Sequence, residues 1–203
     1  MGIFSKKKVI YTACFGDYDR NYKGADKYFN EKNNPFNANT KHLSPRLMAK
    51  MYKVLNPFSY DVWIDSSIEI LDRKGLEKLL VGDFTLFTHP FNKSLEEELN
   101  LCHEIGYLND VHKQKIIDLY ESANMDVEKT PIYASGVLYR TKKTDALNRL
   151  WWSLICQYSY RDQLTLPYAI AQFPELKVKV LDLDIYNNEY LKVSEHQKEQ
   201  DKI

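Results

Sequence analysis

Short apolar runs alternate along this chain with segments of helical period, and this alternation constrains the fold more than any other feature. Runs rich in β-branched and aromatic residues, typical of strands, occupy residues 8–14, 60–65, 68–70, 84–88, 133–140 and 178–181. Helical patterns lie among them at residues 44–55, 72–80, 94–104, 111–123, 144–158 and 162–171. Strands that alternate with helices predict an α/β fold with a mostly parallel central sheet flanked by helices.

The chain length fits a single domain. With 203 residues, of which 44% are hydrophobic, we expect one core and one domain over residues 1–190. Residues 191–203 are polar and are expected to be a tail or the start of a linker to further C-terminal domains. Residues 17–43 show no clear period and are expected to form a long loop.

Bulk charge and cysteine usage exclude several classes of protein. Lys+Arg and Asp+Glu each total 28, so no global field attracts a nucleic acid. The apolar run near the N-terminus is too short for a transmembrane segment or a signal peptide. Three widely spaced cysteines without C-x-x-C pairs indicate reduced thiols, and we expect a cytoplasmic protein.

Polar residues follow several of the predicted strands. Asp17 comes after the first strand, Asp65 directly after the central one, and His89 after the next. Ligands of open α/β sheets bind beyond the carboxyl ends of the strands. A carboxylate at a strand tip suits a divalent cation that also takes oxygens from a diphosphate, which favours Asp65 as a metal ligand. A helix cap or turn residue is an equally good interpretation of Asp65.

The helix over residues 44–55 carries a basic stripe. Ser44 is a typical N-cap and Pro45 suits the first helical turn. Arg46, Lys50 and Lys53 share the side opposite the apolar face. The stripe fits a phosphate site, although a solvated face is the commoner meaning of such spacing.

Residues 161–163 place a cation, an acid and an amide in succession at the start of a predicted helix. Arg161, Asp162 and Gln163 can be directed at a ligand from there. The simpler interpretation is that Asp162 caps the helix and Arg161 is its partner. Trp151 and Trp152 are interpreted as core residues rather than as a sugar platform, although one of two adjacent side chains has to point away from the core.

Taken together, these motifs resemble a known family. They comprise residues 11–19, Lys50, residues 63–69, His89-Pro90 with Glu97, Trp151-Trp152 and residues 161–163. The set is similar to a family of glycosyltransferase-like domains known from plants, bacteria and large algal viruses, and within it the chain looks most like the chlorella-virus members. The resemblance spans roughly residues 9 to 170. It implies a GT-A fold, a UDP-sugar donor and Mn²⁺ or Mg²⁺, with the host cytoplasm as location if the protein is viral.

The resemblance also implies roles for individual residues. Residues 65–67 stand where such enzymes carry an Asp-x-Asp motif, which makes Asp65 the metal and ribose ligand, Ser66 a donor contact and Ser67 a weaker metal ligand. The remaining metal ligand is left open among Glu69, Asp17 and His196. The first-strand segment resembles the uridine-binding edge, so contacts to base and ribose are implied for Tyr11, Thr12, Ala13, Asp17 and Tyr18, and a diphosphate contact for Lys50.

Residues 161–163 resemble the Asp-Gln pair of retaining GT-A enzymes. This implies that Asp162 binds donor-sugar hydroxyls, that Gln163 lies near the anomeric carbon, and that Arg161 belongs to the same catalytic group. The implied function is transfer of a hexosyl or deoxyhexosyl unit, with retention, from a UDP-sugar to a glycan or glycoprotein acceptor. Double displacement and a same-face route both remain open. So do two other functions, a metal-dependent nucleotide phosphoesterase and a non-catalytic sugar- or protein-binding module.

Overall fold

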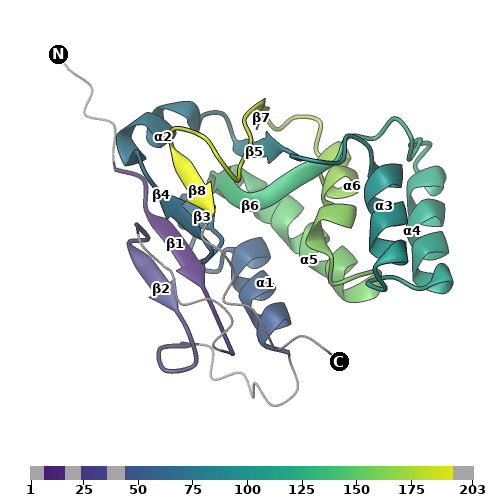
Figure 1. Ribbon diagram of the computed structural model, residues 1–203, viewed down its shortest axis with the longest axis horizontal. Coiled ribbons are helices and arrows are strands. Elements are labelled where there is room, and N and C mark those ends of the chain that lie inside the picture. Colours follow the sequence, from purple (N-terminus) through teal and green to yellow (C-terminus); the bar gives the residue numbers. More distant parts are fainter. Residues whose placement is uncertain (1–6, 17–23, 36–43, 194–203) are drawn as a thin grey trace.

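The computed structural model describes residues 7–16, 24–35 and 44–193, and its centre is a six-stranded sheet (Figure 1). The strand order is β2-β1-β3-β6-β5-β7. Neighbouring strands are parallel except that β6 runs antiparallel to both β3 and β5. The predicted α/β class with a mostly parallel sheet is therefore confirmed. The strands are β1 (Ile10–Ala13), β2 (Lys27–Phe29), β3 (Val62–Ile64), β5 (Phe84–Thr88), β6 (Tyr133–Arg140) and β7 (Val178–Leu181).

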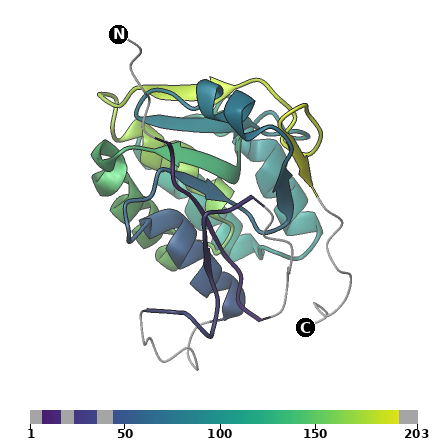
Figure 2. The ribbon, with the colours of Figure 1, turned by 90° about the vertical axis from the view of Figure 1, so that its left-hand side faces the viewer.

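Helices cover both faces of this sheet (Figures 1 and 2). One face packs on α1 (Pro45–Leu55), α5 (Asp145–Gln157) and α6 (Leu166–Ala171). The other packs on α2 (Arg73–Leu79) and on a two-stranded sheet of β4 (Ile68–Ile70) and β8 (Leu191–Val193). The pair α3 (Leu95–Glu104) and α4 (Asp110–Ser122) lies at one end and has a core of its own.

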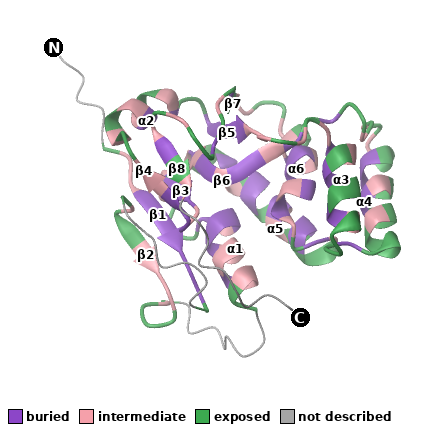
Figure 3. Ribbon diagram, in the orientation of Figure 1, coloured by how far each residue is buried: buried purple, intermediate pink, exposed green. Residues whose placement is uncertain are grey.

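Alternation along the central strands supplies both cores, because successive side chains of a strand point to opposite faces. Tyr11 and Trp63 pack on the α1 and α5 side, whereas their neighbours Ile10, Val62 and Ile64 pack on the α2 side. The strands in the middle of the sheet are consequently buried along most of their length (Figure 3). Within the described part of the chain, no helix is long and apolar enough to span a bilayer.

The observed elements depart from the sequence expectations in three places. Residues 27–29 form β2 inside the predicted loop, and residues 191–193 form β8 where a polar tail was expected. The helix expected over residues 162–171 is divided into a 3₁₀ turn, Asp162–Leu164, and α6, with Pro167 in the first turn of α6. Asp162 is not an N-cap, and that interpretation is wrong, because lysines engage its carboxylate.

The two tryptophans behave as expected of an adjacent pair on a helix. Trp151 is fully buried in the core between the sheet and α5, as the sequence predicts. Trp152 is only partly buried beside the same core. Cys14 and Cys102 are buried, whereas Cys156 is exposed.

Candidate functional site

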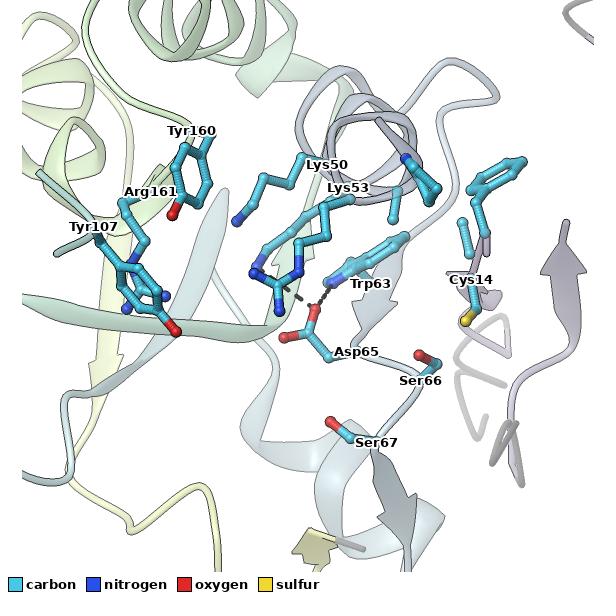
Figure 4. Close-up of a pocket in the computed structure, with 15 residues that line it drawn as sticks. Cys14, Lys50, Lys53, Trp63, Asp65, Ser66, Ser67, Tyr107, Tyr160 and Arg161 are labelled. Atoms are coloured by element: carbon cyan, nitrogen blue, oxygen red, sulfur yellow. Dashed lines mark hydrogen bonds and ion pairs between the residues drawn. The ribbon is translucent and has the colours of Figure 1, made fainter. Parts of the chain in front are cut away.

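A pocket of about 430 Å³ opens where β1 and β3 end and α1 begins (Figure 4). Its floor comes from the residues that follow the two parallel strands, and α1 forms one wall. The opposite wall carries Tyr107, Tyr160 and Arg161. The pocket therefore lies at the carboxyl edge of the sheet, where α/β proteins bind ligands.

The basic stripe of α1 faces this pocket. Ser44 caps the helix by accepting a hydrogen bond from the Leu47 backbone N–H at 3.2 Å. The spacing of Arg46, Lys50 and Lys53 then places all three in the pocket wall. Because Lys53 is only 4% exposed, the solvated-face interpretation of the stripe is wrong.

Asp65 lies at the tip of β3, where the sequence placed it. Its backbone N–H donates to the Gly136 carbonyl at 2.7 Å, which fixes the strand end against β6. Its Oδ1 accepts a hydrogen bond from Trp63 Nε1 at 2.7 Å and lies 3.5 Å from Lys53 Nζ (Figure 4). Oδ2 takes no hydrogen bond from the described residues, and the side chain is 39% exposed. A turn closes from the Asp65 carbonyl to the Ile68 N–H at 2.9 Å, so Asp65 is both a turn residue and an available carboxylate.

Behind the pocket wall, Asp162 joins both lysines of α1. Its Oδ1 forms an ion pair with Lys50, and its Oδ2 lies 2.8 Å from Lys53 Nζ. Ser135 bridges the group, because its hydroxyl accepts from Lys53 at 2.9 Å and donates to Asp162 at 3.0 Å. Trp151 Nε1 donates to the Asp162 carbonyl at 2.9 Å and holds the backbone in place.

Burial and charge set the protonation of this network. Burial favours the neutral form of Asp162, but the charges of Lys50 and Lys53 outweigh it and hold the pKa of the carboxyl well below its usual value. Burial also opposes the charge of Lys53, yet Asp162 and Asp65 raise the pKa of its ammonium group. Burial and the Lys53 charge lower the pKa of Lys50, although Asp162 opposes this shift.

The opposite wall is built around Arg161. Its Nη2 donates to Glu98 Oε1 at 3.1 Å, and its guanidinium lies 5.0 Å from the centre of the Tyr107 ring. Tyr160 packs edge-on against Tyr107. Gln163 is tied down beside them, because its Nε2 donates to the Tyr133 carbonyl at 3.3 Å and its Oε1 accepts from Arg161 at 3.5 Å.

The pocket brings together only some of the residues that the sequence selected. Those that line it are Ala13, Lys50, Asp65, Ser66, Ser67 and Arg161. Tyr11 and Thr12 are fully buried, and the Tyr11 hydroxyl accepts from Arg140 at 2.7 Å. Burial raises the pKa of Tyr11 to about 12 even though Arg140 opposes the shift. Asp17, Tyr18 and His196 lie outside the described residues.

Several pocket residues were not selected as site residues from the sequence. Trp63 had a usable signal, because it precedes Asp65 by two positions in a strand and so shares its face. Tyr107 and Tyr160 had none, because each comes from a connection whose position depends on the packing of distant elements.

A divalent cation fits this site only in the company of a phosphate ligand. Among the described residues, no group of three or more His, Cys, Asp or Glu side chains could hold a metal ion. Asp65 Oδ2 is the available carboxylate oxygen, and the Ser67 hydroxyl lies on the same pocket wall. Mg²⁺ commonly takes one or two protein carboxylates and completes its shell with substrate phosphates and water, and this donor set meets that requirement.

Comparison with known proteins finds a likeness among solved structures. No protein-family model and no curated protein matches the sequence. Among solved structures, the chain is similar to a glycosyltransferase involved in the glycosylation of the major capsid of PBCV-1. That match has 13% sequence identity and a TM-score of 0.46, and it covers 88% of this chain and 82% of the other.

Proposed function

We propose that this protein is a glycosyltransferase that moves a sugar from a UDP-sugar donor to a glycan or glycoprotein acceptor. The observation that carries the proposal is the pocket at the carboxyl edge of the sheet, where the two lysines of α1 meet Asp65. It supports a ligand with a diphosphate group, and the motifs quoted from the sequence support a nucleotide sugar.

Charge in the pocket wall favours a diphosphate. Among the described residues, four cationic side chains line the pocket against a single carboxylate, Asp65; the cations are Arg46, Lys50, Lys53 and Arg161. Ammonium and guanidinium groups form charge-assisted hydrogen bonds with phosphate oxygens. In this assignment Lys50 and Lys53 bind the diphosphate, and the uridine lies along the segment that begins at Ala13.

Asp65 is assigned to the metal, with Ser67 beside it. When bound with the donor, Mn²⁺ or Mg²⁺ would neutralise charge that builds up on the departing diphosphate. Lys50 supplies a second positive charge to the same oxygens from the α1 wall of the pocket. Asp162 keeps both lysines in position, because its two carboxylate oxygens each face one of them.

The proposed reaction exchanges one bond at the anomeric carbon. The bond from that carbon to the diphosphate oxygen breaks, and the acceptor hydroxyl oxygen forms the new bond. In a same-face route the hydroxyl proton passes to the departing diphosphate oxygen, so UDP and the glycoside are the only products. Retention is proposed from the likeness of residues 161–163 to the Asp-Gln pair of retaining enzymes.

The deciding experiment measures UDP released from a panel of UDP-sugars in the presence of Mn²⁺, together with the melting temperature in UDP and Mn²⁺. We expect slow UDP release from at least one donor. We also expect a rise in melting temperature that needs both UDP and the metal, because a ligand bound only to the native state stabilises it. Asp65→Ala should remove the metal-dependent part of that rise.

A matched pair of lysine variants tests the diphosphate assignment. Lys50→Met should weaken UDP binding by about tenfold or more, the effect of losing one charge-assisted hydrogen bond. Lys142→Met, which removes an exposed lysine outside the pocket, should leave UDP affinity unchanged. Release of inorganic phosphate instead of UDP would favour a phosphoesterase. No release with any donor and no UDP affinity would favour a binding module and overturn the proposal.

A further inference from the structure

Two exposed aromatic rings stack on each other at the same edge of the sheet as the pocket. Phe91 follows β5 and Tyr186 follows β7, and their ring centroids lie 5.6 Å apart at an interplanar angle of 29°. Phe91 is 74% exposed, more than any other large hydrophobic side chain in the described residues, and Tyr186 is 44% exposed. Large apolar side chains so open to water commonly mark a binding surface.

Hydrogen bonds on the protein side of Phe91 hold its turn in a fixed conformation. His89 packs edge-on against the Phe91 ring, and its Nδ1 accepts a hydrogen bond from the Asn92 backbone N–H at 2.9 Å. Asn92 in turn donates to the buried carboxylate of Glu98 at 2.6 Å. Phe91 is therefore exposed on a turn whose conformation is fixed by hydrogen bonds. Binding residues generally need such rigid support.

Strand order places this pair beside the donor pocket. Because β1, β3, β5 and β7 are parallel, their carboxyl ends share one edge, in the order β1, β3, β5, β7 with β6 between β3 and β5. Asp65, at the end of β3, therefore lies between the segment after β1 and the aromatic pair. The donor nucleotide and the pair are on opposite sides of the reacting centre.

Contacts around Gly136 show how close the pair comes to Asp65. A Cβ atom built on Gly136 would lie 3.1 Å from Ile185 Cδ1 and 3.3 Å from Asp65 Oδ2. Ile185 immediately precedes Tyr186 in the chain. Burial raises the pKa of Tyr186, and the nearby charge of Asp65 adds to the rise. Glu98 connects the two sites as well, because it accepts from both Asn92 and pocket residue Arg161.

We propose that Phe91 and Tyr186 form the acceptor subsite, on which a pyranose ring of the acceptor glycan stacks. The inference rests on the proposed function, since it names the second substrate of the same site. Pyranose rings present a face of C–H groups that packs on aromatic rings, and their hydroxyls bind polar groups at the rim. Two stacked rings are too small an area for a stable protein interface, which needs about 1,000 Å² or more.

The test measures saturation-transfer NMR from the protein to methyl glycosides of glucose, galactose, mannose, xylose and rhamnose, each with UDP present. We expect transfer to the ring C–H protons of at least one glycoside. Phe91→Ala and Tyr186→Ala should each weaken binding of that glycoside about fivefold to tenfold, as expected for loss of one aromatic contact. Phe91→Tyr and Tyr186→Phe should retain most of the affinity, because a ring remains.

Val111→Ala is the matched control, since it shortens another exposed apolar residue on α4 and should leave glycoside binding unchanged. No transfer to any glycoside, or equal affinity in the alanine variants, overturns the acceptor subsite. Failure of the proposed function has a different signature: the wild-type protein releases no UDP from any donor, whatever the glycoside result.

Discussion

At the residue scale, Asp162 has the most concentrated set of charged contacts in the site. Lys50 and Lys53 each face one of its oxygens, and the side chains of Asp162 and Lys53 are almost wholly withdrawn from water. Removing one partner of a buried ion pair leaves an uncompensated charge. We expect Asp162→Asn to lower the free energy of unfolding at pH 7 by about 3–5 kcal/mol, measured by urea denaturation.

The same variant should change the response to acid. The pKa of Asp162 lies below its unfolded value of about 3.9, so its stabilisation is complete above that pH and is lost as the pH falls. Below about pH 4, the stability of the wild type should therefore fall more steeply than that of Asp162→Asn. Asp126→Asn, which removes an acid from an exposed pair with Lys129, should retain the wild-type profile closely. Parallel profiles for wild type and Asp162→Asn would contradict this account.

Local sequence could identify Asp65 but not the function of Asp162. Asp65 follows an apolar strand directly, and that pattern alone indicates an acid at a strand tip. The contacts of Asp162 are with Lys50, 112 residues away, and with Lys53. A local pattern shows only that an acid begins a helical segment, which is why capping was the natural and wrong interpretation.

At the element scale, the C-cap residue of α1 contributes to the stability of the protein. Asn56 adopts a left-handed conformation with φ of 45°, and its side chain accepts from the Tyr60 N–H at 3.0 Å and donates to the Tyr60 carbonyl at 2.7 Å. Asn56→Gly keeps the backbone conformation but loses both bonds, so we expect a loss of about 1–2 kcal/mol in unfolding free energy. Asn56→Ala should lose about 1–2 kcal/mol more, because alanine is strained there.

Urea denaturation of the two Asn56 variants checks this order. Equal stabilities would show that the left-handed backbone contributes nothing. The result bears on the site because α1 carries Arg46, Lys50 and Lys53, whose positions depend on the register of the helix.

Most elements were predictable from periodicity, and the exceptions share a cause. The strands β2 and β8 lie in mostly polar segments, so no apolar run marks them in the sequence. The antiparallel direction of β6 was also unreadable, because residues 133–140 look like any buried strand and their direction depends on the path of the intervening helices. Direction is a property of the whole chain rather than of the strand.

At the scale of the whole molecule, Gly136 is where the main sheet, the small sheet and the pocket meet. A Cβ there would come within 2.9 Å of Ile68 Cδ1 and 3.3 Å of Asp65 Oδ2. We expect Gly136→Ala to lower the unfolding free energy by about 1–3 kcal/mol through overpacking. It should also weaken binding of UDP with Mn²⁺, because the side chain of Asp65 is displaced.

Gly106→Ala is the control for Gly136→Ala, because it introduces backbone strain without crowding neighbouring side chains. Gly106 has a φ of 79°, and a Cβ atom added there would meet no atom of the described residues within 4 Å, so alanine costs backbone strain alone. We expect a loss of stability with unchanged UDP affinity, measured by calorimetry. If Gly136→Ala also leaves the affinity unchanged, Gly136 does not govern the position of Asp65.

The position of β6 has a consequence for synthesis of the chain. β3 and β5 are joined only through β6, which follows both in sequence. Until residues 133–140 leave the ribosome, each of the two earlier strands keeps an edge of unpaired backbone groups, and such edges recruit other chains. A nascent chain arrested just before β6 should therefore be prone to aggregation. Emergence of β6 pairs the facing edges of β3 and β5, and the other edge of β5 stays open until β7 emerges.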